Sequence, residues 1–224
     1  MKKIENKFLL PTKFCDSDNE KIIKLAKEIT KDCSFEREKA IRLFNFVRNN
    51  FKYAFGPWNF KASEVIYLKT GMCTTKSELL VALLRAINIP AGFKVVKIKA
   101  KQVFGKFAIF SFITNQISEI SIHIYVSVFL DGKWIDVDPS LDEALIRGLI
   151  FVGYDRSMLD KWDGKKDMMN FFEPDELIEN GNLVESIDEY HLKKRKVNKN
   201  LFIFFSNFIM NYYRFLGLLL KIKK

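Results

Sequence analysis

The spacing of apolar residues divides the chain into helical and extended stretches. In the first part apolar residues recur every three or four positions, which is the spacing of one helix face. They predict a helix that begins with a capping box at residues 17–20, and a second helix with Ser34 as its N-cap. A short helix covers about residues 62–69 and ends at Gly71, because glycine tolerates a positive φ.

The next stretch contains a buried helix and then changes to strand-like alternation. Residues 73–87 are apolar on most sides, which predicts a central helix that ends before Pro90. Residues 93–100 alternate between apolar and polar, as a half-solvated strand does. Residues 120–138 form two alternating runs joined by Asp131–Gly132, which predicts a β-hairpin with a two-residue turn.

The register of this hairpin brings two polar side chains together. It sets Asp138 opposite Tyr125 and His123 opposite Ser140, with all four side chains on one face. His123 and Asp138 are then diagonal neighbours, about 7–8 Å apart at Cα and within side-chain reach. The other face carries apolar residues at the alternating positions that begin at Ile122, and burying them fixes the register.

Cys73 stands at the start of the predicted central helix. The positive end of the helix dipole and the unpaired backbone N–H groups there favour the thiolate, which is the nucleophilic form. A histidine that exchanges a proton with the thiolate, and that is held by an aspartate, is the general arrangement of an activated nucleophile. The helix would place Cys73 against the face with His123 and Asp138, and the Cys73 backbone N–H is available to an oxyanion.

The order and surroundings of these residues resemble the transglutaminase-like superfamily. The resemblance covers about residues 17–142 and rests on three motifs: G-x-C at 71–73, L-R-A-x-x-I-P at 84–90, and W-x-x-x-D-P at 134–139. It implies an α+β fold of papain-like topology, in which a central helix with an N-terminal cysteine packs on an antiparallel sheet. It also implies that Cys73 is the nucleophile, His123 the acid/base and Asp138 the orienting carboxylate.

The resemblance further implies a reaction on amide bonds. Members of the superfamily cleave amides in peptides or glycans, or transfer the acyl group of a glutamine side chain to an amine, so the expected substrate is a peptide, a protein or another amide. A side-chain oxyanion donor often lies upstream of the cysteine in such folds, and Trp58 and Asn59 are the candidates here. The alternative is a catalytically inactive binding or scaffolding module that docks on a membrane or a partner through its basic tail.

Other chemistry is less well supported by the residues. A zinc site built on Cys73 and His123 lacks a fourth ligand, so neither a metal nor a cofactor is expected. Asp136 shares the face of Asp138 but lies one pair farther from His123, which makes it the weaker orienting candidate. The remaining cysteines, Cys15 and Cys33, are predicted to be structural or surface thiols, and His191 has no assigned role.

The formal net charge of +10 is concentrated in one segment. The predicted catalytic core at 1–162 is mildly basic, the connecting segment at 163–192 is acidic, and together they almost cancel. The tail at 193–224 has nine Lys and Arg residues and no acidic residue. Without an Arg/aromatic stacking platform, this distribution does not favour nucleic-acid binding.

The tail predicts an amphipathic helix. Residues 201–220 are mostly apolar, and Asn207, Asn211, Arg214 and Lys221 fall at helical spacing as one narrow polar stripe. Such a basic helix suits an anionic membrane surface or a partner groove. Packing against the core of the same domain is an equal alternative, and a membrane-spanning helix ranks third.

The remaining composition bears on the compartment. The start of the chain has no apolar stretch typical of a secretory signal, and the three cysteines form no C-x-x-C pair or disulfide framework. A cytoplasmic protein, membrane-associated if the tail binds lipid, is therefore expected.

Overall fold

The computed structural model describes residues 6–105, 115, 117–155, 159–169, 171–192 and 200–222. The helices in this part are η1 (Asn6–Phe8), α1 (Glu20–Thr30), α2 (Glu36–Asn50), α3 (Ala62–Leu68), α4 (Cys73–Arg85), α5 (Ala100–Gly105), α7 (Glu143–Phe151), η3 (Pro174–Glu176), α8 (Asp188–Leu192) and α9 (Asn200–Ile222). The strands are β1 (Lys52–Tyr53), β2 (Thr70–Gly71), β3 (Ala91–Ile98), β4 (Ser121–Leu130), β5 (Lys133–Val137), β6 (Leu177–Glu179) and β7 (Leu183–Val184).

An antiparallel sheet forms the centre of the fold. Within the described residues its strands run in the order β5-β4-β3-β6, and β7 also pairs with β3. The hairpin register is confirmed: Leu130 pairs with Lys133 and Val126 with Val137. Both turn residues, Asp131 and Gly132, have positive φ, as a two-residue turn of type I′ requires. The short strands β1 and β2 pair in parallel beside this sheet.

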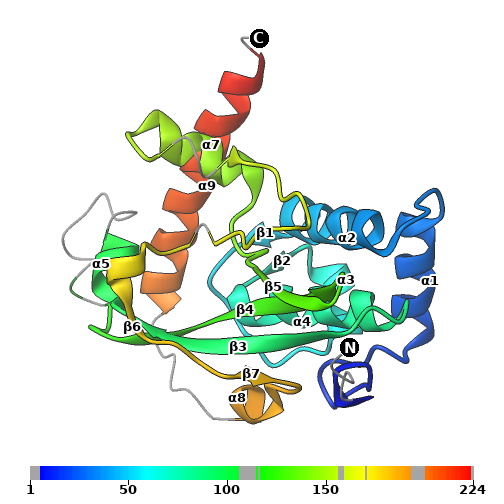
Figure 1. Cartoon of the computed structure of the whole chain (residues 1–224). Helices are drawn as coiled ribbons and strands as arrows, with labels where there is room; N and C mark the ends of the chain where they lie inside the picture. Colours follow the sequence, from blue (N-terminus) through cyan, green and yellow to red (C-terminus); the bar gives the residue numbers. More distant parts are fainter. Residues whose placement is uncertain are drawn as a thin grey trace.

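One face of the sheet is covered by the N-terminal helices. Helix α4 is buried along its whole length and packs on β3 and β4, with α1, α2 and α3 around it (Figure 1). The apolar side of β4, represented by Ile124, Val126 and Val128, belongs to this core. The fold is therefore α+β with the central helix on an antiparallel sheet, as the resemblance implied.

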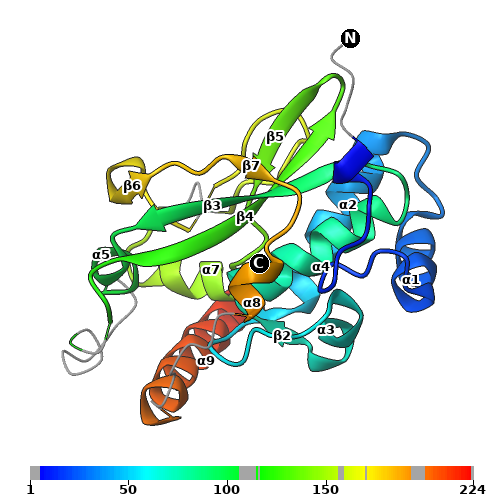
Figure 2. The ribbon, with the colours of Figure 1, turned by 90° about the horizontal axis from the view of Figure 1, so that it is seen from below.

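The opposite side of β3 and β4 carries a second apolar cluster. Val96 and Tyr125 lie there with side chains from helices α7 and α9, among them Leu149 and Tyr213. Figure 2 shows α9 at the margin of the molecule, with α7 on its inner side. This second cluster covers the face on which the sequence placed the polar pair.

Helices α7 and α9 approach each other through glycines. A Cβ atom on Gly148 would lie 1.8 Å from the carbonyl oxygen of Tyr213, and one on Gly217 would lie 2.0 Å from that of Ala144. Neither distance leaves room for a side chain. Glycine at both positions therefore allows the two helix backbones to come into direct contact.

Two residues of the polar stripe predicted on α9, Asn207 and Arg214, bind the rest of the domain, whereas Asn211 is exposed. The side-chain amide of Asn207 exchanges two hydrogen bonds of 2.8 Å with the backbone of Phe55. Arg214 is buried and forms an ion pair with Asp142 at 2.7 Å. Of the alternatives for this helix, packing on the same domain is the one observed. No helix in the described part of the chain has the length and apolarity needed to cross a membrane.

Two predicted helix starts are wrong by one or two positions. The N-cap of α1 is Asn19, whose side chain accepts the N–H of Lys21 at 3.0 Å, so Ser17 does not cap this helix. Helix α2 begins after Phe35, and Glu38 accepts the N–H groups of Ser34 and Phe35. At α1 the Asn19 side chain thus binds a free N–H group of the first turn, whereas at α2 the Glu38 side chain binds the N–H groups just before the helix.

The predicted role of Gly71 is also wrong. Helix α3 ends at Leu68, and its C-cap residue Lys69 has a φ of 54°, whereas Gly71 belongs to β2. Residues 102–118 were ambiguous between a loop and a short element. Helix α5 covers the first of them and ends at Gly105, and residues 106–114 and 116 lie outside the described residues. So does the first part of the basic tail, at 193–199.

Candidate active site

Cys73 is the first residue of α4, directly after the short strand β2. The hydroxyl of Thr75 accepts the N–H of Met72 at 3.0 Å and so caps the start of the helix. A Cβ atom on Gly71 would lie 2.5 Å from this hydroxyl, so the tight entry into α4 requires a small residue. The thiol is buried, with 6% of Cys73 exposed, and stands at the positive end of the helix dipole.

His123 and Asp138 form a buried pair at the end of the hairpin. The His123 Nε2 lies 2.7 Å from the Asp138 Oδ2, and the two residues are 1% and 7% exposed. The second carboxylate oxygen of Asp138 accepts the N–H of Ser140 at 2.9 Å. Both oxygens are thus occupied, which holds the carboxylate in the plane of the contact with the ring.

Cys73 reaches this pair because β5 is shorter than β4. The ladder ends at Val126 and Val137, so the first half of β4 has no β5 neighbour. The start of α4 fills that place, and the Ser77 hydroxyl donates to the Ile124 carbonyl at 3.2 Å. The structure thereby brings the Cys73 thiol within hydrogen-bonding reach of the His123 ring and the Ile124 N–H.

The charges of these three residues stabilise one another. Burial alone would raise the pKa of the Cys73 thiol, but the His123 charge and hydrogen bonds from His123 and the Ile124 N–H lower the pKa below its ordinary value. Burial would lower the pKa of His123, but the Asp138 and Cys73 charges raise it to about 10. The pKa of Asp138 is lowered, because the His123 charge and hydrogen bond outweigh its burial. These shifts favour a thiolate–imidazolium pair over the neutral pair.

Aromatic rings cover the imidazole. The ring of Phe171 stacks on that of His123 with centroids 4.1 Å apart and an angle of 14°, and Phe172 meets it edge-on at 5.6 Å. These rings exclude water from one side of His123 and strengthen its contact with Asp138. Neither phenylalanine was predicted to belong to the site. In the sequence the two residues are only an apolar doublet within the acidic segment at 163–192.

A small cleft opens beside Cys73 and His123. Its cavity volume is about 70 Å³. The side chains around it are mainly aromatic or apolar. The lining residues are Tyr53, Phe55, Trp58, Met72, Cys73, Thr74, Phe104, Ser121, Ile122, His123, Ile124 and Tyr190. Apart from the Cys73–His123 pair itself, this lining contains no Asp, Glu, Lys or Arg, so the cleft suits an uncharged group beside the reacting carbonyl.

The remaining candidate residues separate in the structure. Trp58 lines the cleft, whereas Asn59 is exposed and is not part of the lining. Asp136 forms an ion pair with Lys94 at 2.6 Å and accepts a hydrogen bond from the Ser127 hydroxyl, so it is engaged away from His123. No group of three potential metal ligands occurs among the residues that the structure describes.

Comparison with known families identifies the group to which this chain is related. The model of the transglutaminase-like superfamily matches residues 23–139, which is half of the chain and includes Cys73, His123 and Asp138. The chain belongs to this superfamily. A comparison with curated proteins found no match.

Two solved structures resemble this transglutaminase-like chain in part. One is named as a "putative cysteine protease" from Cytophaga hutchinsonii, with 25% identity and a TM-score of 0.47 over 59% of this chain and 40% of that one. The other is named as a "putative protease" from Parabacteroides distasonis, with 17% identity and a TM-score of 0.40 over 58% of this chain and 25% of that one. The transglutaminase-like chain therefore spans less than half the length of either protein.

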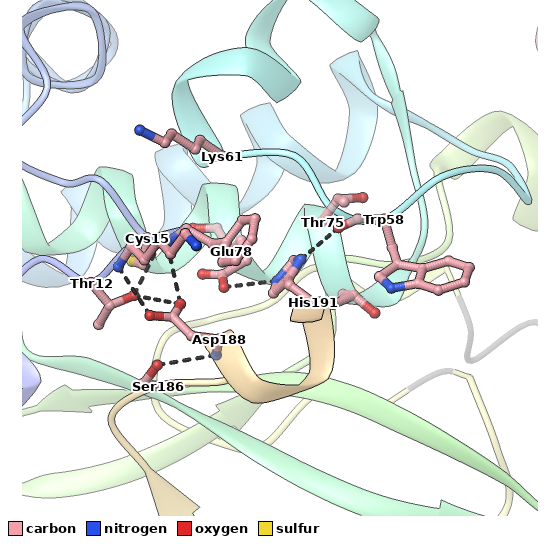
Figure 3. A network of polar contacts seen from close by, with 12 residues as sticks. Thr12, Cys15, Trp58, Lys61, Thr75, Glu78, Ser186, Asp188 and His191 are labelled. Carbon is pink, nitrogen blue, oxygen red and sulfur yellow. Dashed lines mark hydrogen bonds and ion pairs between the residues drawn. The ribbon is translucent and has the colours of Figure 1, made fainter. Parts of the chain in front are cut away.

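A buried histidine outside the superfamily match supports one wall of the cleft. The His191 Nε2 lies 3.0 Å from Glu78 Oε1, and its Nδ1 lies 2.6 Å from the Trp58 carbonyl oxygen (Figure 3). Phe14 stacks on the ring with centroids 4.3 Å apart. Helix α8 thus joins α4 to the loop that carries Trp58, and the adjacent Tyr190 lines the cleft. No local motif indicates this role, because the partners of His191 are 113 and 133 residues away in the chain.

Proposed function

We propose that this chain is a cysteine hydrolase that acts on amide bonds through Cys73, His123 and Asp138. The observation that carries the proposal is the buried 2.7 Å contact between His123 and Asp138, with Cys73 lining the same cleft as His123. This is the arrangement of an activated thiol nucleophile. Membership of the transglutaminase-like superfamily agrees with it, since that match includes all three residues.

The proposed reaction proceeds through a thioester. The Cys73 thiolate attacks the amide carbonyl carbon. The oxyanion that forms accepts a hydrogen bond from the backbone N–H of Cys73. His123 then donates a proton to the leaving nitrogen as the C–N bond breaks, which releases the amine. Water adds to the thioester while His123 accepts its proton, and collapse of the intermediate releases the acid and restores the thiolate. Trp58 is the proposed side-chain donor to the oxyanion, because it lines the cleft and Asn59 does not.

Hydrolysis of a peptide amide is the proposed reaction, with acyl transfer to an amine as the variant. Both proceed through the same thioester, and water is always present as an acceptor. The aromatic lining of the cleft favours an uncharged residue beside the scissile bond. The cavity of about 70 Å³ holds about two waters, so a substrate enters as a narrow, extended segment.

A thiol-reactive probe tests the proposal without knowledge of the substrate. At pH 6 Cys73 is expected to react faster with iodoacetamide than Cys15 or Cys33, since a lowered pKa gives it a larger thiolate fraction. Cys15 provides a buried control, because burial raises the pKa of its thiol well above the ordinary value. Substitution Cys73→Ala should abolish both this labelling and hydrolysis across a panel of peptide amides.

The competing hypothesis is a non-catalytic module that retains the fold. The restricted cleft and the burial of Cys73 favour it, since both limit access to the thiol. It predicts that Cys73 is labelled at pH 6 no faster than the partly exposed Cys33. That result, or peptide hydrolysis that persists in Cys73→Ala, would overturn the proposed mechanism.

A further inference from the structure

Helix α9 exposes an apolar face from Leu201 to Leu219. Large apolar side chains recur on this face every three or four residues, with exposed fractions between 46% and 68%. They are Leu201, Phe204, Phe208, Tyr212, Phe215, Leu218 and Leu219. A surface helix of a globular protein normally directs such a face toward the core. This continuous outward stripe, called the α9 outer face below, therefore indicates a contact surface.

The orientation of the helix is fixed by its polar side chains. Arg214 is bound to Asp142 and to the Tyr53 carbonyl, and Asn207 is bound to the backbone of Phe55. These contacts hold the Asn207 and Arg214 side of the helix against the domain. Helix α9 cannot rotate to bury its outer face without leaving Asp142 as an unpaired buried charge.

In sequence, most of the excess positive charge of the protein lies just before and just after this helix. Residues 1–192 have a formal charge of +1, whereas residues 193–224 have nine basic and no acidic residues. Arg214 is neutralised by Asp142, so the remaining basic residues lie in sequence before Asn200 or from Lys221 onward. The apolar stripe is thus flanked by lysine and arginine on both sides.

We propose that the α9 outer face docks on an anionic lipid surface. A helix of 23 residues is about 34 Å long, so its two basic ends are too far apart to meet one compact acidic group. A bilayer provides anionic headgroups along the full length and an apolar layer between them. The outer face supplies aromatic and leucine side chains for that layer, and the helix lies in the plane of the interface. The proposal does not depend on the catalytic function.

Vesicle co-sedimentation tests this proposal with the full chain. The wild type should sediment with vesicles of phosphatidylcholine and phosphatidylserine, less with phosphatidylcholine alone, and less at high salt. The triple variant Phe204→Ser, Phe208→Ser, Phe215→Ser should bind the anionic vesicles at least about tenfold more weakly, because each exposed ring contributes apolar area. Its circular dichroism should remain that of the wild type, since these side chains make few contacts with the core.

Matched substitutions elsewhere control for general loss of apolar surface. Phe35, just before α2, and Tyr67, on α3, are 69% and 65% exposed, and the variant Phe35→Ser, Tyr67→Ser should bind the vesicles as the wild type does. Failure of the wild type to bind anionic vesicles would overturn the proposal, as would an equal loss of binding in the control variant. Self-association that the triple variant abolishes, without any vesicle binding, would instead assign the face to a second copy of this chain.

Discussion

Replacement of Arg214 by methionine tests what holds α9 on the domain. The Arg214 Nε lies 3.0 Å from both carboxylate oxygens of Asp142, and Nη2 lies 2.7 Å from Oδ2 and also donates to the Tyr53 carbonyl. Asp142 additionally caps α7 by accepting the N–H of Leu145 at 3.1 Å. The ion pair therefore links α9 to α7 and to β1 at one point.

The expected cost follows from burial. Arg214 and Asp142 are 5% and 3% exposed, and methionine fills the space without replacing the charge. Breaking a buried pair leaves an uncompensated carboxylate and costs about 3–5 kcal/mol. The partly exposed pair between Arg147 and Glu143 on α7 is the matched control, and Arg147→Met should cost less than about 1 kcal/mol.

Equilibrium unfolding in urea measures both free energies at neutral pH. The Arg214→Met variant should unfold at a clearly lower urea concentration than Arg147→Met, with a smaller far-ultraviolet helix signal if α9 detaches first. The pKa of Asp142, now held low by the guanidinium against burial, should rise. Equal unfolding free energies for the two variants would refute the assignment of Arg214 as the anchor.

Further predictions concern the site and the core. Without the His123 charge, burial should raise the pKa of Cys73. In His123→Ala the pH midpoint of Cys73 alkylation by iodoacetamide should therefore lie above pH 9.0. A midpoint equal to that of the wild type would contradict the ion pair. Burial lowers the pKa of Lys76 to about 7 from 10.5, so the unfolded chain binds more protons between these values. Unfolding free energies should therefore rise with pH across this window relative to Lys76→Met. Gly148→Ala should lower the free energy of unfolding by about 1–3 kcal/mol or more, because its methyl group clashes with α9. Gly56→Ala should leave Tm unchanged, because a Cβ atom there would have no neighbour within 4 Å. Equal Tm values for the two variants would contradict the close packing of α7 and α9.

The local parts of the site were predictable from the sequence. The Asp131–Gly132 turn and strict alternation along the hairpin determine which residues face each other, so the contact of His123 with Asp138 follows. The position of Cys73 at a helix start follows from the apolar run after it. These features depend on residues close together in the chain, where dihedral preferences and side-chain periodicity decide the conformation.

The tertiary contacts of the site were not predictable in the same way. Phe171 covers the imidazole, and His191 binds Glu78 and the carbonyl of Trp58. None of these contacts follows from a local motif. Each is formed when segments distant in sequence meet over the sheet, and the choice of partner depends on which polar groups burial would otherwise leave unpaired.

Helix α9 separates most clearly what each level decides. The sequence by itself determined that this segment is an amphipathic helix with basic flanks, because that requires only helical spacing and composition. It left open which face meets the domain. The tertiary structure decided this, because Asp142 and the backbone of Phe55 offer partners to Arg214 and Asn207 that apolar side chains cannot use. Because Arg214 and Asn207 bind the domain, the aromatic α9 outer face remains exposed.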